Sequence, residues 1–110
     1  NNTPMLSLDE ITDGLTPNHF ALSDNYPNPF NPVTSFSFSL PQSTEVSINI
    51  YSVLGKKVAT VFNGSAKPGT YKVTWNGKDI NGRNLPSGLY IYELDAGIHF
   101  KQTKKMTLIK

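Results

Sequence analysis

The chain has no cysteine among its 110 residues, which excludes a disulfide framework and a thiolate metal site. Ten lysine and arginine residues nearly balance eight aspartates and glutamates, so the net charge is only +2 and no dense cationic stripe suggests nucleic-acid binding. No stretch approaches the roughly 20 apolar residues of a membrane helix, and no signal peptide opens the sequence. Because Asn1 is not an initiator methionine, we expect a fragment whose export signal would lie upstream.

Signatures of catalysis and ligand binding are also missing. No G-x-S-x-G, H-E-x-x-H or phosphate-cradling glycine motif occurs, and His19 and His99 lie far apart without other ligands at metal-site spacing. Residues 79–82 resemble part of a calcium loop but lack its third ligand position and bidentate glutamate, which favours an Asx turn and leaves calcium as a minor alternative. We therefore expect no enzyme, no cofactor and no metal site, although two carboxylates that meet only in the fold stay an open alternative.

What the sequence does contain is a period of two. Polar and apolar residues alternate through much of the chain after residue 34, as in strands that bury one face. Asn63-Gly64 and Asn76-Gly77 predict tight turns that end two of the runs. Runs spaced by roughly 8–12 residues with turns between them predict an all-β sandwich or barrel. The predicted strands cover residues 35–40, 46–50, 57–62, 71–75, 89–94 and 100–109.

The alternation also assigns the residues that face inward. In the fifth run Glu93 and Asp95 share one face, so the tyrosines between them take the other. Each large side chain that becomes buried contributes about 1.5–3 kcal/mol, so the set can stabilise one sandwich. Tyr51 falls out of phase and is predicted to be the exposed aromatic residue. The inward set is Phe36, Phe38, Leu40, Val46, Ile48, Ile50, Tyr71, Val73, Trp75, Tyr90, Tyr92 and Leu94.

The first quarter of the chain looks different. Residues 1–24 are polar without sustained periodicity, which predicts a linker that docks at its end, with a first strand near residues 20–22 as the alternative. Residues 25–32, with the sequence NYPNPFNP, are called the proline motif below. Its three prolines fix φ, remove three donors and restrict the residues before them. We expect an extended, polyproline-like segment anchored by Tyr26 and Phe30, serving either as a signal or as a rigid spacer.

Five segments then follow one another in a distinctive order. The proline motif and Thr34 precede the alternating phenylalanine run, and VSINIY is followed by LGKKV. Next come PGTYKVTWNGKD, NG and SGLY, and the chain closes on KKMTLIK. Together, over about residues 19–110, these segments resemble the type A C-terminal sorting domains of the type IX secretion system. The central block is also similar to the Ig-like domain of the flagellar hook-capping protein.

The resemblance implies an Ig-like antiparallel β-sandwich of about seven strands over residues 25–110. It implies a non-catalytic module that directs secretion of an upstream passenger protein across the outer membrane and its attachment to the cell surface. The implied partners are the outer-membrane secretion machinery and the upstream passenger domain of the same chain. The implied localisation is secreted or at the cell surface, after passage through the periplasm. The candidate recognition residues are Tyr26, Pro27, Asn28, Pro29, Phe30, Asn31, Pro32, Lys104, Lys105 and Lys110.

Two other functions stay open at this stage. A carbohydrate-binding or cell-attachment module of a polysaccharide-degrading enzyme would present coplanar exposed aromatic side chains on one face. An Ig-like spacer would have no partner of its own. A core that takes up nearly every aromatic residue would favour the sorting function over carbohydrate binding.

Overall fold

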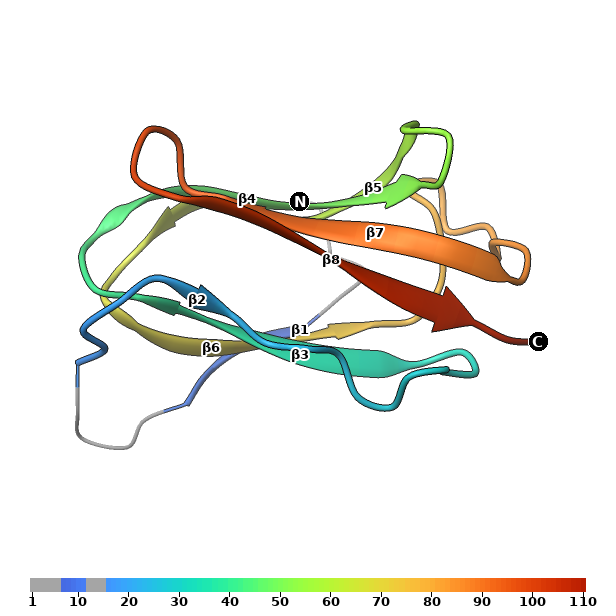
Figure 1. Cartoon of the computed structure of the whole chain (residues 1–110), viewed down its shortest axis with the longest axis horizontal. Helices are drawn as coiled ribbons and strands as arrows, with labels where there is room; N and C mark the ends of the chain where they lie inside the picture. The colour runs from blue at the N-terminus through green and yellow to red at the C-terminus, as the bar shows by residue number, and fades with distance from the viewer. Residues whose placement is uncertain (1–6, 12–15) are drawn as a thin grey trace.

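The computed structural model describes residues 7–11 and 16–110, and these form two packed layers of β-strands (Figure 1). No helix occurs in this part of the chain. Within it the strands are β1 (Ser7–Ile11), β2 (Ala21–Leu22), β3 (Thr34–Leu40), β4 (Thr44–Ser52), β5 (Lys57–Ala66), β6 (Gly69–Trp75), β7 (Gly88–Asp95) and β8 (Lys101–Leu108).

Each layer is a four-stranded antiparallel sheet. The strand order is β1-β6-β3-β2 in the first sheet and β5-β4-β7-β8 in the second. Consecutive strands β3 and β4 lie in different sheets, as do β5 and β6, so the connections cross between layers as in Ig-like folds. The expected Ig-like antiparallel sandwich is confirmed, and the two-residue β2 extends it at one edge.

The space between the sheets holds the core that the alternation predicts. All twelve predicted inward residues are buried, and Trp75, Tyr92 and Leu94 are fully so. Phe36 packs on Tyr92 across the sheets, with ring centroids 4.3 Å apart. The Trp75 ring nitrogen donates to the carbonyl oxygen of Lys78, 3.1 Å away, so its one polar group is satisfied inside. Trp75 is thus a core residue, as expected.

One predicted turn is wrong. The Asn63-Gly64 pair lies inside β5, where Gly64 is opposite Val46 of β4, and the chain turns only after Ala66. Pairing with a neighbouring strand outweighs the local preference of Asn-Gly for a turn. The other predicted turn is confirmed, because Gly77 has φ of 75° and a β-carbon there would stand 3.1 Å from the Pro32 carbonyl oxygen.

Two segments within the expected linker, residues 1–24, belong to the first sheet. β1 pairs with β6 over five residues, and β2 pairs with β3. A strand therefore lies at residues 21–22, where the alternative placed one, but β1 precedes it in the chain. Edge strands of this kind carry little periodicity of their own, since a single neighbour holds them through backbone hydrogen bonds. Residues 1–6 and 12–15 of the expected linker lie outside the described residues.

Candidate recognition site

The proline motif connects the two sheets along one side of the sandwich. Tyr26 pairs with Ser35 at the edge of β3, and each backbone N–H donates to the other residue's carbonyl, at 2.7 and 3.0 Å. Four residues later the Phe30 N–H donates to Thr107 of β8 at 2.9 Å, and the Ile109 N–H donates to Phe30 at 2.8 Å. The motif therefore covers the outer edge of β8 near its end and ties it to the first sheet.

The motif is not the extended, polyproline-like segment that its prolines predict. Bends occupy residues 27–29 and 31–32, and each of its three Xaa-Pro peptide bonds is cis. A buried polar cluster holds the first bend. The Asn25 amide donates to the Thr34 hydroxyl oxygen at 3.0 Å, and that hydroxyl donates to the Pro27 carbonyl at 2.8 Å. Fixed φ values at proline are equally compatible with a folded segment when neighbouring groups supply its hydrogen bonds.

The two aromatic residues of the motif have opposite environments. Phe30 is only 1% exposed and packs against Trp75, with ring centroids 5.8 Å apart. Tyr26 is 81% exposed. The prediction that both residues anchor the motif is therefore confirmed for Phe30 and wrong for Tyr26. Tyr51, predicted to be the exposed aromatic, is half-buried and donates its hydroxyl to Glu93.

Side chains reinforce the junction between the motif and the last strands. The Asn28 side-chain oxygen accepts from the Thr107 N–H at 3.0 Å. Lys104 forms an ion pair of 3.0 Å with Asp24. The Tyr92 hydroxyl donates to the Ser23 carbonyl at 2.7 Å, and burial is the main cause that raises the pKa of Tyr92. Residues about 80 positions apart in sequence thus form one structure.

The structure brings most of the candidate recognition residues to this side of the molecule. Phe30 is buried and Lys104 is partly buried, so both act mainly within the fold. Lys105 is opposite Ile91 in the second sheet, and Lys110 lies at the end where its N–H donates to the Ser87 hydroxyl. The exposed candidates are Tyr26, Pro27, Asn28, Pro29, Asn31, Pro32, Lys105 and Lys110.

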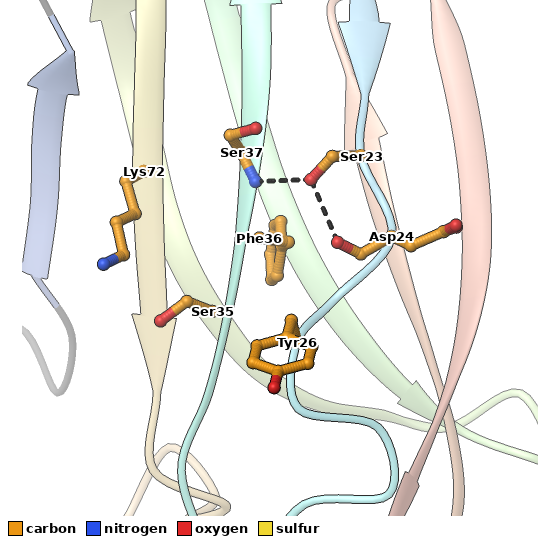
Figure 2. Close-up of a pocket in the computed structure, with 7 residues that line it drawn as sticks. All are labelled: Ser23, Asp24, Tyr26, Ser35, Phe36, Ser37 and Lys72. Carbon is orange, nitrogen blue, oxygen red and sulfur yellow. Dashed lines mark hydrogen bonds between the residues drawn. The ribbon is translucent and has the colours of Figure 1, made fainter.

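A shallow pocket of about 390 Å³ lies beside the exposed tyrosine (Figure 2). It opens where the chain leaves β2 and runs past β3, and Figure 2 shows Tyr26 at its border. Phe36 of β3 also lines it, but the Phe36 ring belongs to the core. The Ser37 N–H donates to the Ser23 hydroxyl at 2.8 Å and holds one wall. Asp24 and Lys72 place opposite charges at its sides. The arrangement suits a peptide segment with an apolar side chain and polar backbone groups.

Sequence reasoning missed several residues of this site. Asn25 and Thr34 flank the prolines, and polar residues at both borders of a rigid segment are the signal that the sequence offers, whereas their burial and mutual hydrogen bond come only from the structure. Asp24 and Ser23 carry no such signal. Their partners, Lys104 and Tyr92, are distant in sequence and become neighbours only when the sheets pack.

The Asp79 loop forms the Asx turn that its sequence favours. One carboxylate oxygen of Asp79 accepts from the N–H groups of Asn81 and Arg83, both at 2.9 Å. The hydrogen bond from the Arg83 backbone is the largest cause that lowers the pKa of Asp79.

Across the described part of the chain, no group of three or more His, Asp or Glu side chains is placed to hold a metal ion. The same residues include no helix able to span a membrane.

Residues 23–97 match the family described as the FlgD Ig-like domain. The chain belongs to this family. FlgD from P. aeruginosa matches this FlgD-like Ig domain with 30% identity and a TM-score of 0.53, over 68% of this chain and 58% of that chain. No curated protein matches the sequence.

The FlgD-like Ig domain also has the fold of segments in two larger proteins from Porphyromonas gingivalis. Dimeric latent PorU matches 90% of this chain with a TM-score of 0.63 and 18% identity. PorZ, an essential surface component of the type IX secretion system, matches 83% with a TM-score of 0.53 and 18% identity. This chain spans about a tenth of each of these proteins, 10% of PorU and 11% of PorZ.

Proposed function

We propose that this domain is a non-catalytic sorting module of type IX secretion. It directs an upstream passenger protein across the outer membrane and to the cell surface, and the secretion machinery recognises it by protein–protein contact. Membership of the FlgD Ig-like family and the fold shared with PorU and PorZ support a module of this class. The order of its motifs supports the sorting role.

The observation that carries the proposal is the backbone junction between Phe30 and β8. Through it the first and last parts of the sorting-type sequence pattern form one continuous surface, although they are about 80 residues apart. A receptor that reads this surface reads both parts at once, and it reads them only after the domain has folded. Such a surface distinguishes folded cargo from unfolded chains, which present the same residues separately.

Tyr26 and its pocket are the contact we assign to the receptor. An aromatic side chain that is largely exposed beside a pocket supplies a large apolar area to a partner at low conformational cost. Pro27, which follows Tyr26, and the two backbone hydrogen bonds to Ser35 fix the backbone that carries the ring, which reduces the ordering cost of binding. Exposed Lys105 supplies a cation on the adjoining strand.

The distribution of aromatic residues favours sorting over carbohydrate binding. Among the phenylalanine, tyrosine and tryptophan side chains of the described residues, only Tyr26 is exposed, and most of the others belong to the core. Phe20, Phe100 and His99 stack on one another in a column, with ring centroids 5.4 and 6.1 Å apart. Side chains stacked in this way do not form the flat row of exposed rings that a sugar chain would require.

A secretion assay tests the proposal. The domain is fused behind an inert reporter exported to the periplasm of a bacterium with a functional type IX system, and reporter is measured in the medium and at the cell surface. We expect the intact domain to carry the reporter across the outer membrane, and Tyr26→Ala to reduce this transfer at least about tenfold, as for loss of an aromatic hot spot.

Point substitutions are required because removal of residues 104–110 would also remove Met106 and Leu108, which are buried in the core. Lys67→Ala, an exposed change at the opposite end of the sandwich, is the matched control and should secrete normally. If the reporter stays periplasmic with the intact domain, the sorting role is wrong. If Tyr26→Ala secretes like the control, the recognised surface lies elsewhere.

A further inference from the structure

Exposed apolar side chains gather at one end of the sandwich. This end, called the loop end here, comprises residues 31–33, 53–57, 76–87 and 109–110, and it lies on the right of Figure 1, beside the C label. Of the eight large hydrophobic residues that are exposed among residues 16–110, five belong to it, whereas the opposite end has Ile98. The five are Val33, Val53, Leu54, Ile80 and Ile109.

The segments of the loop end are bound to one another, so they form a single surface. The Ile80 N–H donates to the Val58 carbonyl at 3.0 Å, which joins the β6–β7 connection to the start of β5. Gly77 lies against the Pro32 carbonyl and the Leu108 side chain. The Lys110 N–H donates to the Ser87 hydroxyl at 3.0 Å. The apolar tips are therefore held at set positions relative to one another.

Cations surround these apolar tips. The loop end has five lysine or arginine residues, and Asp79 is its only acidic residue within the described chain. Asp79 is already engaged, since its carboxylate accepts two backbone N–H groups and lies 3.8 Å from Arg83. The cations are Lys56, Lys57, Lys78, Arg83 and Lys110.

A pocket of about 250 Å³ lies between the two main loops of this end. Lys56, Lys57 and Arg83 line it, together with the apolar side chains of Val58 and Ile80. It joins positive charge to apolar surface, the combination that recognises an anionic lipid headgroup with the apolar chains beside it. The lining has three cations against one carboxylate, so an anion entering it is stabilised.

We propose that the loop end is a docking face for an anionic phospholipid membrane. Leu54 is 92% exposed and Ile80 is 66% exposed, and they project from separate loops. Separate apolar tips match a fluid surface, which adapts its shape, better than a protein partner, which would need a complementary groove for each tip. Apolar tips that enter the headgroup boundary, with lysines beside them that attract anionic lipid, are the pattern of reversible interfacial binding.

Vesicle co-sedimentation of the whole chain tests the docking face. We expect binding to phosphatidylglycerol vesicles, weak binding to phosphatidylcholine vesicles, and loss of the difference at high salt. Leu54→Ser should weaken binding to phosphatidylglycerol at least about tenfold. Lys56→Gln should weaken it about fivefold, as expected for one lysine near a charged surface.

The opposite end of the sandwich supplies matched controls. Ile98 is 97% exposed in a loop there, and Lys67 is an exposed lysine in a turn. Ile98→Ser and Lys67→Gln make the same chemical changes and should leave vesicle binding unchanged. Equal losses at both ends, or no binding to phosphatidylglycerol, would overturn the proposal and leave an acidic protein as the partner for this face. The assay involves no secretion, so its outcome is independent of the sorting function.

Discussion

The two halves of the proline motif differ in how they use an aromatic residue. In the first half Tyr26 pairs with β3 through its backbone and leaves its ring in solvent. In the second half Phe30 pairs with β8 and places its ring against Trp75 in the core. The comparison teaches that one short motif can supply both a structural closure and a recognition element, because its bends turn successive aromatic rings in different directions.

The largest expected effect is on the second half of the motif, called the structural half here because its Phe30 ring lies in the core. Phe30→Ala removes a fully buried ring between the sheets and leaves a cavity, so it should lower the free energy of unfolding by about 3–5 kcal/mol. Tyr26→Ala should change it by less than about 0.5 kcal/mol. Urea unfolding of both variants measures the difference. A similar loss of unfolding free energy in the two variants would mean that Tyr26 supports the fold as much as Phe30 does.

The buried polar cluster that shapes the first bend should be the next most sensitive. Thr34→Val keeps the shape of the side chain but removes the acceptor for Asn25 and the donor to the Pro27 carbonyl. The Asn25 amide keeps its 3.2 Å hydrogen bond to the Pro27 carbonyl. The two hydrogen bonds that are lost, at about 0.5–1.5 kcal/mol each, should therefore cost about 1–3 kcal/mol. The same unfolding measurement applies, with Thr103→Val on the exposed face of β8 as control. An unchanged midpoint in Thr34→Val would show that the bend does not need this cluster.

Tyr92 links the junction to alkaline stability. Burial is the main cause, and the charge of Asp24 the second, that raises the folded pKa of Tyr92 above its ordinary value of 10.0. As pH rises, Tyr92 therefore ionises in the unfolded chain before it ionises in the folded one. The stability that the buried, protonated Tyr92 contributes is complete below about pH 10 and is lost as pH rises above it. Tyr92→Phe should cost about 1 kcal/mol near pH 8 through the lost hydrogen bond to Ser23.

That cost should shrink or reverse near pH 11, because phenylalanine cannot ionise. Urea unfolding at about pH 8 and about pH 11 measures both values for each protein. A penalty that stays the same at both pH values would contradict the link between burial of Tyr92 and alkaline stability.

The smallest expected effect concerns the ion pair across the junction. The Lys104 side chain is 26% exposed but that of Asp24 is 89% exposed, so solvent screens the pair. Lys104→Ala should lower stability by about 0.2–1 kcal/mol at low salt and by less at high salt. A double-mutant cycle with Asp24→Ala isolates the pair itself. A coupling well above about 1 kcal/mol would place this pair with the structural half of the motif.

The alternation of residue types was sufficient to find the six longer strands, β3 to β8, and the buried faces of four of them. Phe36, Ile48 and Val73 follow a local rule, since side chains two residues apart lie on the same face of any strand. The Asn63-Gly64 pair shows where local rules fail. Its turn preference is small compared with the hydrogen bonds gained by continuing to pair with β4.

The candidate site was only half accessible from sequence. The proline motif and the closing lysines were identified by composition and by their resemblance to sorting domains. The sequence did not show which of the two aromatic residues faces solvent, because prolines restrict φ without specifying the direction of the bends. The partnership of Asp24 with Lys104 has no local signature either, since nothing in the sequence near one residue refers to the other.

By itself, the sequence determined the class of fold, because a period of two and the turn residues act over neighbouring positions. It also determined twelve of the side chains that form the core. Only the tertiary structure decided that the proline motif closes the edge of β8, that Tyr26 stands in solvent, and that apolar and cationic residues from separate loops meet at one end. These outcomes depend on contacts between distant segments, which become defined only when the two sheets pack against each other.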